Sequence, residues 1–504
     1  MDERKFEIII HATDAAACSR LIQSLETVNV PENFDAEIQP VTGDEKYFAY
    51  DTAMRSSDAK YKIYIDEHAI ITDENFLIEL LKIFRDESIV AVGTSGAVEL
   101  STHGISLNSA KRTDKNFRGE VEIADGFFFA TQYDLPWRHD LFADNFFGGQ
   151  AQCVEFKRAG YKIFVGGEWI DYRGENFTLD ETSRQKFLDE YSTDLFPLVS
   201  IIIPTFNRPK YFRIALESAL NQTYRNIEVV ISDDSTIDDT EHLIQDYLAR
   251  DKRITYFRNK GFTADDNWKF LRAYNNPAAE YVNWLMDDDL FYPTKIEKMV
   301  EVYRNNPDVS LVTSSRDVLD EEGNIRGKIQ KPFEHDVKIS GNDAGKMLFL
   351  LNNYIGEPTT VLIRKKFLRD NDLCWNADET GFFPLIDVST WLQLLTQGNM
   401  VRLIECLSGF RYHSKQASYW IDIYSLSPVA GAKLLRTAWN KKIFLTNESD
   451  FRKVVAQTIS IAAERLEKIY DEQMYSKEVE LLEKTLAALA QSLINGYKLE
   501  LPTD

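Results

Sequence analysis

Residues 280–290 read Glu280 Tyr281 Val282 Asn283 Trp284 Leu285 Met286 Asp287 Asp288 Asp289 Leu290. An apolar run of this kind is typical of a strand buried between two layers of helices. The run ends abruptly in three carboxylates, and ligands of open α/β sheets bind just beyond the carboxyl ends of such strands. Hard cations such as Mg²⁺ or Mn²⁺ take oxygen ligands and bridge protein carboxylates to phosphates. The stretch therefore predicts a metal and diphosphate site, and the alternative is an acidic turn that simply faces water.

The chain around this stretch alternates strand-like runs with helical spacing. Strands are predicted at 198–203, 227–232 and 254–257, and helices at 212–220, 238–248 and 267–274. This βαβαβ order is typical of a nucleotide-binding half-domain with a largely parallel sheet. The glycine signatures of dinucleotide folds and phosphate loops are absent, and carboxylates take their place. Asp238 and Glu241 predict a capping box for the second helix.

Composition limits the classes of function. The 504 residues are enough for about three domains. A formal net charge of -22 argues against binding to nucleic acid or to an anionic membrane surface. No apolar run approaches the roughly 20 residues of a transmembrane helix, and the N-terminus lacks the apolar core of a signal peptide. The four cysteines lie far apart, in neither a zinc spacing nor a disulfide framework. These observations favour a cytoplasmic protein.

Several motifs in register resemble the family 2 inverting glycosyltransferases of GT-A fold. They are 199–208, 221–224, 229–235, 238–240 and 285–290, and the agreement covers roughly residues 198–320. The resemblance implies a nucleotide-sugar donor, with UDP as the favoured carrier. It places the nucleotide base and ribose on Pro204, Thr205, Asn207, Arg208 and on Asp233 or Asp234. Carboxylates suit this role because they accept hydrogen bonds from ribose hydroxyls and base N–H groups. Arg258 is a further candidate for base or phosphate, and the alternative is an ordinary surface arginine.

The same resemblance assigns the metal, Mn²⁺ or Mg²⁺. The family pattern is Asp-x-Asp-Asp, and alignment on Leu285 and Leu290 puts Met286 at its first position. Asp289 is then the main predicted metal ligand, Asp288 contacts the ribose or the metal, and Asp287 is a less certain ligand. Phe410 to His413 resembles a trailing Arg-x-His segment of the family, whose histidine approaches the metal or diphosphate. A structural histidine is the alternative for His413.

Residues 381–395 resemble the acceptor segment of the family, in which an acidic pair precedes an aromatic-rich helix. Ile386 replaces the first acid, and Asp387 is the second, which the resemblance makes the general base. An inverting transfer needs one carboxylate to take the proton of the acceptor hydroxyl. Asp387 also stands where the N-cap of the following helix is expected, and the two roles are compatible.

The first part of the chain resembles the glycosyltransferase-like family named after a streptomycin-biosynthesis protein. The resemblance rests on residues 61–68, 124–138 and 155–161 and covers most of 5–165. That family shows His-Gln-Asp where this chain has Asp66 Glu67 His68, and His-Phe-Tyr-Asp where it has Phe146 Phe147 Gly148 Gly149. His68 therefore replaces the expected metal-site Asp. We expect this domain to have lost chemistry and to serve acceptor binding or assembly. The alternative is that it uses different ligands, with Asp66 and His68 still binding a metal instead of being hydrogen-bonded structural residues.

The predicted fold class is α/β, with two GT-A-like nucleotide-diphospho-sugar transferase domains in tandem, at 1–190 and 197–425, and a helical region at 426–504. Weak patterning at 325–345 predicts a loop near the acceptor. The helical stripes of the tail pack on the catalytic domain or, as the second interpretation, on another copy of the chain.

The predicted function is metal-dependent, inverting transfer of a sugar from a nucleotide donor to a glycan on a protein, lipid or polysaccharide. The alternative is a non-catalytic glycan-binding or assembly scaffold made of two transferase-like domains. Its support is Met286 and Ile386 at positions where the family has acids, together with the degenerate first domain. A nucleotidyltransferase is disfavoured by the first loop, which lacks the expected glycines.

Overall fold

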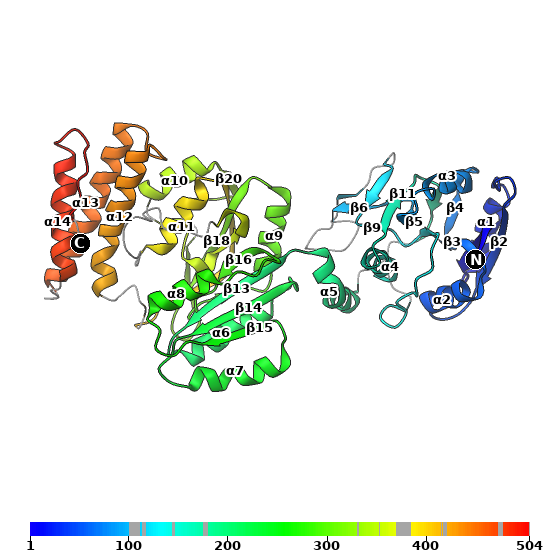
Figure 1. Cartoon of the computed structure of the whole chain (residues 1–504), viewed down its shortest axis with the longest axis horizontal. Helices are drawn as coiled ribbons and strands as arrows, with labels where there is room; N and C mark the ends of the chain where they lie inside the picture. Colours follow the sequence, from blue (N-terminus) through cyan, green and yellow to red (C-terminus); the bar gives the residue numbers. More distant parts are fainter. Residues whose placement is uncertain are drawn as a thin grey trace. The chain divides into compact units, whose positions relative to one another are not determined.

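The computed structural model describes residues 1–99, 111–112, 117–143, 147–174, 180–329, 332–351, 353–368, 385–414, 416, 421–471 and 477–502 (Figure 1). The chain divides into two compact units, Met1–Phe196 and Pro197–Asp504. Both units are α/β, and the second ends in a helical region, so the predicted fold class is confirmed. The finer division at residues 425 and 426 stays a prediction.

The first unit is built on a seven-stranded sheet in the order β2-β1-β3-β10-β5-β11-β8. Its strands are β1 Asp2–His11, β2 Asp35–Val41, β3 Ala59–Asp66, β5 Ile89–Gly93, β8 Gly119–Val121, β10 Phe128–Thr131 and β11 Lys162–Val165. The short strands β4 Ala69–Ile71 and β12 Ile170–Tyr172 pair with each other, and β6 Gly96–Glu99 pairs with β7 Lys111–Arg112 and β9 Ile123–Ala124. The helices are α1 Ala15–Leu25, α2 Lys46–Ser56, α3 Phe76–Ile83, α4 Phe147–Arg158 and α5 Glu181–Leu195.

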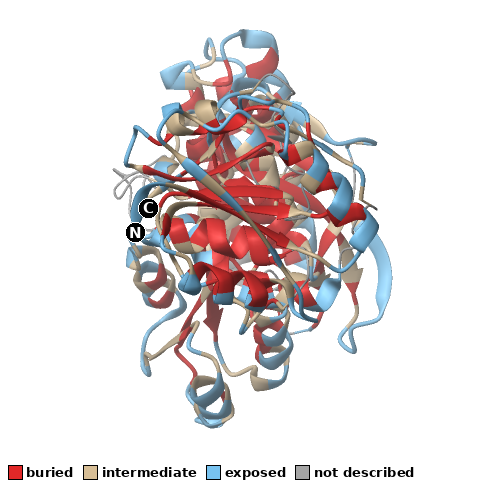
Figure 2. Cartoon of the chain, turned by 90° about the vertical axis from the view of Figure 1, so that its right-hand side faces the viewer, coloured by how far each residue is buried: buried red, intermediate tan, exposed pale blue. Residues whose placement is uncertain are grey.

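The apolar runs of β1 and β3 explain this sheet, because their buried residues pack in one core with the inner faces of α1 and α3. That core includes Ile8, Leu21, Ile63 and Leu80. The strands through the middle of Figure 2 are accordingly buried, and exposed residues lie mainly on loops, outer helix faces and edge strands such as β2. β2 and β3 both run parallel to β1, so the loops after β1 and β3 meet at one edge of the sheet.

The second unit has a ten-stranded sheet whose main order is β15-β14-β13-β16-β21-β18-β22-β17. Its strands are β13 Leu198–Thr205, β14 Ile227–Asp233, β15 Ile254–Arg258, β16 Ala279–Trp284, β17 Leu290–Phe291, β18 Val309–Leu319, β19 Ile325–Ile329, β20 Val337–Ile339, β21 Val361–Arg364 and β22 Asn399–Arg411. The helices are α6 Pro209–Leu220, α7 Asp239–Arg250, α8 Ala264–Ala273, α9 Lys295–Asn305, α10 Gly341–Leu350, η1 Pro358–Thr360, η2 Lys365–Phe367 and α11 Ile386–Leu395. β14 and β16 both run parallel to β13, which aligns the three strand ends that the motifs occupy.

The helical region consists of α12 Ile421–Lys441, α13 Glu448–Asp471 and α14 Lys477–Ser492. Leu434 of α12 belongs to the same buried cluster as Trp284 and Trp391, so this helix packs on the sheet domain of the second unit. Leu435, Val454 and Leu489 lie in a further cluster that joins the three helices to one another. The apolar faces of these helices therefore pack on the sheet domain and on one another within the second unit.

Two local predictions were wrong. Residues 325–345 hold β19, β20 and the start of α10 instead of a loop. Their weak patterning has a physical cause, since β19 is exposed along most of its length. The capping box does not form at α7, because the Asp238 carboxylate contacts Arg258 and Lys260. The box forms instead at α8, between Thr263 and Asp266.

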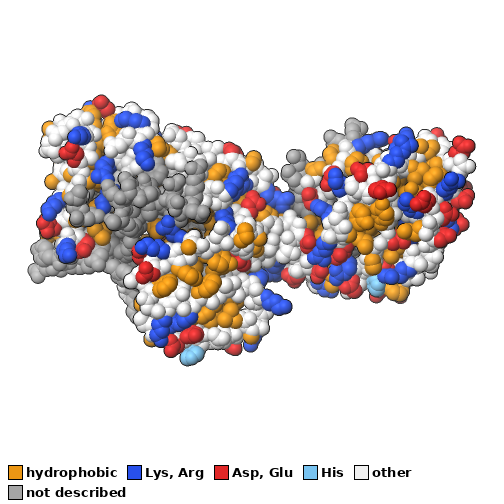
Figure 3. Space-filling view, in the orientation of Figure 1, with side chains coloured by type: hydrophobic (Ala, Val, Ile, Leu, Met, Phe, Trp, Pro, Cys, Tyr) orange, Lys and Arg blue, Asp and Glu red, His pale blue; other side chains and the backbone are white. Residues whose placement is uncertain are grey.

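No helix in the described part of the chain is long and apolar enough to cross a membrane. On the face drawn in Figure 3, acidic and basic side chains are intermixed over both units. The net charge of -22 is therefore not gathered into one acidic patch on that face.

Candidate active site

The first predicted loop, after β13, is fastened to the Asp triplet. Asp287 accepts hydrogen bonds from the Thr205 hydroxyl at 3.0 Å and from the Phe206 backbone N–H at 3.3 Å. Pro204 and Thr205 are the last residues of β13 and lie opposite Ser232 and Asp233 of β14. Asp287 is 4% exposed, and its burial, followed by the charge of Asp288, raises its pKa to about 7. Asp287 thus links the triplet to the first loop through these two hydrogen bonds.

Asn207 connects the first loop to the second. Its φ of 54° lies in the left-handed region, which asparagine tolerates better than most residues. Its backbone N–H donates to the Ser235 hydroxyl at 2.7 Å, and its side-chain oxygen accepts from the Thr236 N–H at 2.9 Å. The next residue, Arg208, donates from Nη1 to Asp287 at 3.1 Å and to Asp288 at 2.9 Å. The guanidinium therefore offsets part of the charge of the triplet.

His413 reaches the triplet through sheet pairing. β17, directly after the triplet, pairs antiparallel with β22, with Leu290 opposite Gly409. This pairing returns the chain to the triplet, and His413 Nε2 lies 2.9 Å from Asp288 Oδ2. The imidazole is 2% exposed and its ring centre is 5.2 Å from that of Tyr211. The structure therefore brings together Arg208, Asp288 and His413.

Asp289 has different surroundings from Asp288. Its Oδ2 accepts from the Thr359 hydroxyl at 2.6 Å and its Oδ1 from the Arg411 backbone N–H at 3.0 Å. The Arg411 side chain donates to the Asp288 carbonyl and to two carbonyls of the loop after β18. Burial, followed by the charges of Asp288 and Glu357, raises the pKa of Asp289 well above its usual value. Both oxygens of Asp289 are thus used to join the triplet to η1 and β22.

The predicted nucleotide carboxylates lie at the end of β14. Asp233 is fully buried and accepts from the Tyr256 hydroxyl at 2.7 Å and the Ser235 N–H at 2.9 Å. Asp234 is 4% exposed and accepts from the Asn267 amide at 2.7 Å, and burial is the main cause that raises its pKa to about 6.

Arg258 lies beside Asp233 but has other partners as well. Its guanidinium is 3.5 Å from Asp233, 3.2 Å from Asp238 and 3.4 Å from Glu241. These ion pairs join β15 to the start of α7. With a side chain that is 15% exposed, Arg258 is not an ordinary surface arginine, and its role in base or phosphate binding stays a prediction.

Asp387 lies in the first turn of α11, and Leu385 takes the N-cap position in its place. Its carboxylate accepts from the Asn353 amide at 2.9 Å and from the Val388 N–H at 2.8 Å. Burial is the main cause that raises the pKa of Asp387 to about 6, and the charge of Glu357 adds to it. The motif residues 381–384 lie outside the described part of the chain.

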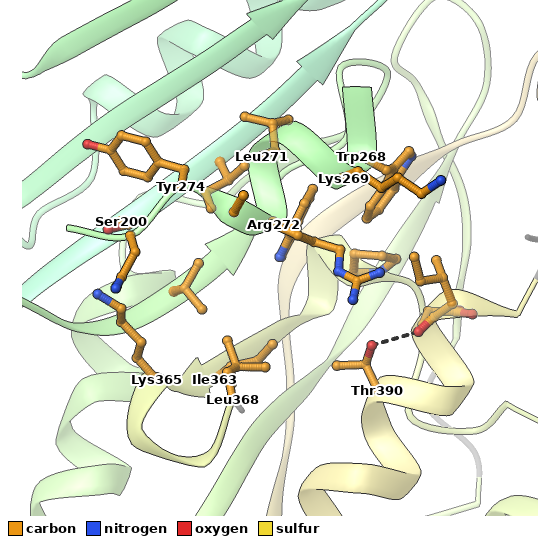
Figure 4. A pocket seen from close by; sticks show the side chains of 18 of the residues that line it. Ser200, Trp268, Lys269, Leu271, Arg272, Tyr274, Ile363, Lys365, Leu368 and Thr390 are labelled. Carbon is orange, nitrogen blue, oxygen red and sulfur yellow. Dashed lines mark hydrogen bonds between the residues drawn. The ribbon is translucent and has the colours of Figure 1, made fainter. Parts of the chain in front are cut away.

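Asp387 also lines a cavity of about 760 Å³ between α8 and α11 (Figure 4). Trp268 of α8 and Trp284 of β16 are part of its lining, and their rings stack with centres 4.4 Å apart. Figure 4 shows Arg272 and Lys365 reaching into the same space from α8 and η2. A cavity of this size, with aromatic faces and a few polar groups, is suited to a small organic ligand or the end of a longer one.

The segment from Asn353 to Thr360 links the base candidate to the triplet, and sequence reasoning missed it. Asn353 donates a hydrogen bond to Asp387. The Thr359 hydroxyl donates to Asp289 and accepts from the Met286 N–H at 3.2 Å. Between them, Glu357 forms an ion pair with Arg316 at 2.7 Å. Gly356 has a φ of +116°, and a Cβ there would lie 2.6 Å from the Thr360 hydroxyl. The sequence signal was the Gly356 Glu357 Pro358 turn directly before a strand.

The donor atoms at the sheet edge fit a hard divalent cation that is shared with a diphosphate. Among the described residues, no three His, Cys, Asp or Glu side chains group as a complete metal cage. Asp288 and His413 nonetheless present a carboxylate and an imidazole at 2.9 Å from each other. Mg²⁺-type ions at phosphate sites take one or two carboxylates and complete their shell with substrate phosphates and water. Two protein ligands are therefore compatible with such a site.

Comparisons with known proteins place both units in glycosyltransferase families. Residues 200–371 match the family described as Glycosyl transferase family 2, and residues 7–118 and 109–191 match the family described as Glycosyltransferase like family. The second unit thus contains a family 2 glycosyltransferase domain, and the first contains a glycosyltransferase-like domain. Both family resemblances seen in the sequence are confirmed.

Curated relatives carry the same class of name. An uncharacterized glycosyltransferase of Rickettsia typhi is 34% identical over 203 residues, which are 38% of this chain and 60% of that protein. A protein of Campylobacter jejuni named GalNAc(5)-diNAcBac-PP-undecaprenol beta-1,3-glucosyltransferase is 30% identical over 176 residues, 35% of this chain and 54% of that protein. The chain therefore spans little more than half the length of these relatives.

The comparison with solved structures gives weak matches, two of which are to proteins in complex with a nucleotide or a nucleotide sugar. TarS 1-349 of S. aureus in complex with UDP has a TM-score of 0.38 and 14% identity, over 59% of this chain and 82% of that one. The mannosyltransferase PcManGT of Pyrobaculum calidifontis, in complex with GDP-Man and Mn²⁺, has a TM-score of 0.34 and 15% identity, over 61% of this chain and 89% of that one.

Proposed function

We propose that residues 197–425 form a catalytic domain that transfers a sugar, with inversion, from a nucleotide donor to a hydroxyl of a glycan acceptor. The observation that carries the proposal is the cluster of Arg208, Asp288 and His413 at the sheet edge of a family 2 glycosyltransferase domain. UDP is the favoured carrier nucleotide. The name of the Campylobacter jejuni relative supports a lipid-linked glycan among the acceptors.

The donor is assigned to the strand-end loops. Pro204, Thr205 and Asn207 lie beside Asp233 and Asp234, where a base and a ribose find carboxylate acceptors. Asp288 and His413 are the residues that we propose to hold Mn²⁺ or Mg²⁺ together with the diphosphate. When bound, this cation stabilises the negative charge of the departing nucleoside diphosphate.

The two other acids of the triplet receive positioning roles. Asp287 fastens the first loop, and Asp289 fastens η1 and β22. The predicted order of metal ligands therefore changes in the proposal, from Asp289 to Asp288 with His413. The reason is that hydrogen bonds from Thr359 and Arg411 engage both oxygens of Asp289, whereas the bonds of Asp288 to Arg208 and His413 both engage the same oxygen, Oδ2.

Asp387 is the proposed general base. Its carboxylate takes the proton of the acceptor hydroxyl while that oxygen bonds to the anomeric carbon and the bond from this carbon to the diphosphate oxygen breaks. A pKa of about 6 leaves the group ionised at neutral pH and still basic enough to accept a proton. The cavity that Asp387 lines offers the acceptor a path to this carboxylate.

The test incubates the purified chain with a panel of UDP-sugars and Mn²⁺ and measures UDP release, with donor binding measured in parallel by calorimetry. We expect one donor to bind and to release UDP only when a divalent cation is present. Asp387→Asn should keep donor binding and lose transfer, whereas Asp288→Asn should lose metal-dependent donor binding. If none of the nucleotide sugars binds in the presence of Mn²⁺ or Mg²⁺, the scaffold interpretation replaces this proposal.

A further inference from the structure

The two units share one arrangement, which lies after the strand that pairs with the first strand on the side opposite the second strand. This strand is β3 in the first unit and β16 in the second. In the first unit, Glu67 accepts from the Thr13 hydroxyl at 2.5 Å, the Thr13 N–H at 2.9 Å and the Asp14 N–H at 2.8 Å. In the second unit, Asp287 accepts from the Thr205 hydroxyl and the Phe206 N–H. In both cases the acid after the strand holds the loop after the first strand. Glu67 therefore corresponds to Asp287.

This correspondence fixes the next positions. His68 stands where the second unit has Asp288, and Asp66 stands where it has Met286. The carboxylate that is the proposed metal ligand of the second unit is thus replaced by an imidazole in the first. The remaining acid, Asp66, is turned toward its own neighbours, since its Oδ1 accepts from the His68 backbone N–H at 3.0 Å and lies 3.1 Å from His68 Nδ1.

A cation is already present beside Asp66. Lys46, the first residue of α2, places its Nζ 3.1 Å from Asp66 Oδ2. The side chains are 12% and 14% exposed, and the ammonium also lies 5.7 Å from the centre of the Tyr50 ring. The ammonium of Lys46 thus offsets the charge of Asp66, and the adjacent Glu67 is bound to the loop after β1. At this distance, a second cation on Asp66 would be repelled strongly, because water screens a nearly buried pair little.

We propose that the ammonium of Lys46 takes the place of a divalent cation in the first unit. The metal that its family resemblance implies does not fit the residues present, because Asp66 is paired with the Lys46 ammonium and an imidazole, His68, replaces the expected acid. The chain then binds one divalent cation, in the second unit; this last statement rests on the proposed function. The first unit works without metal, in ligand binding or in assembly.

The experiment counts Mn²⁺ bound to the full chain, by electron paramagnetic resonance of the free ion at increasing Mn²⁺ concentration. We expect no more than one tightly bound ion, which Asp66→Asn leaves in place. Lys46→Gln should add a second, weaker ion on Asp66 and His68, because Asp66 then lacks its ammonium partner. Lys46→Arg should not add one, because it keeps the positive charge. Lys60→Gln is the matched control, since it removes an amine that pairs with exposed Glu3 on the same unit.

The outcomes separate the two proposals. A second Mn²⁺ in the unmodified chain that Asp66→Asn removes would overturn the inference, and so would the absence of any gain in Lys46→Gln. If the unmodified chain binds no Mn²⁺, the metal site of the second unit fails, whereas the comparison of Lys46→Gln with Lys46→Arg still decides the inference. Near-ultraviolet circular dichroism checks that each variant is folded. The number of Mn²⁺ ions bound to Asp66→Asn tests the inference even if the Lys46 variants do not fold.

Discussion

Asp387 has the two features that its proposed role as general base requires, access to a cavity and hydrogen bonds that fix its carboxylate. It lines the cavity between α8 and α11, and its carboxylate is held by the Asn353 amide and the Val388 N–H. A general base needs both features, because it must reach the acceptor hydroxyl and keep a fixed direction. The sequence-based alternative of a helix cap is not met, since Leu385 holds that position.

Replacing Asp387 with Asn should lower kcat about 10²- to 10⁴-fold, the usual contribution of a general base. The affinity for the donor should stay unchanged, because the donor loops do not include Asp387. Burial raises the pKa of this acid in the folded state, so its ionised form disfavours folding above about pH 6. The variant should therefore be no less stable at pH 8 in a urea titration, and a large loss of stability there would point to a structural role for Asp387 instead.

The pH dependence follows from the same group. The proposed base acts when it is deprotonated, so kcat/KM should fall as the pH drops through about 6 and should level off above it. Asn353 donates a hydrogen bond that favours the ionised form and lowers the pKa. Asn353→Ala should therefore shift the midpoint upward. Asn305→Ala, in which an exposed amide that bonds Glu301 is removed, should leave the midpoint in place; an equal shift in both variants would argue against Asn353 as a positioning residue.

The sequence alone was sufficient to identify the acids at the strand ends, because each follows an apolar run in a pattern of alternating strands and helices. It was not sufficient to rank them. Asp288 and Asp289 are neighbours of the same type, and what separates them is His413 on one and Thr359 with Arg411 on the other. These partners lie 70 or more positions away along the chain. Such contacts follow from strand pairing, which no local pattern encodes.

The segment around η1 acts as one element that joins the two halves of the site. Thr359 donates to Asp289, and the Trp391 indole of α11 donates to the Gly356 carbonyl at 3.0 Å. Thr359→Val should leave a buried oxygen of Asp289 without its donor and cost about 1 to 3 kcal/mol of unfolding free energy. Chemical denaturation measures this cost. Thr396→Val serves as the control, because its hydroxyl bonds a helix carbonyl in a part-buried position; equal losses would contradict a special role for Thr359.

The helical region offers a second prediction for an element. Leu482 of α14 is fully buried in a cluster with Ala462 and Ile469 of α13. Leu482→Ala should destabilise this packing by about 2 to 5 kcal/mol, the range for deleting a buried leucine side chain. Leu493, just beyond α14, is 37% exposed, and its replacement by Ala should change the stability by less than about 0.5 kcal/mol. Thermal unfolding of both variants at equal concentration makes the comparison.

Helices and strands could be predicted where buried apolar residues form a run or recur at regular spacing in the sequence. They were missed where few of their residues are buried. β13, β14 and β16 are apolar runs and were expected. β2, Asp35–Val41, was missed because it is an edge strand in which no residue is fully buried. β19 and β20 were missed for the same reason, since they pair at the margins of the second sheet and carry mostly exposed or half-buried residues.

At the scale of the whole molecule, the chain has two units with separate cores. The core of the first unit holds Leu21, and that of the second holds Trp391. We expect two transitions in a calorimetric scan, because each core is buried within its own unit. Leu21→Ala should lower the temperature of one transition by several degrees and leave the other unchanged. A shift of both transitions together would show that the two units unfold as one.

The pairing of Lys46 with Asp66 has a consequence for the history of the first unit. Losing the ammonium alone leaves a nearly buried carboxylate unpaired, and losing the carboxylate alone leaves the ammonium unpaired. Breaking one side of such a pair costs several kcal/mol when it is buried. If the ammonium stands where a cation would bind, as proposed, then a metal can return to this unit only after Lys46 is replaced. That replacement by itself destabilises the unit, so natural selection acts against the first step of the reversal.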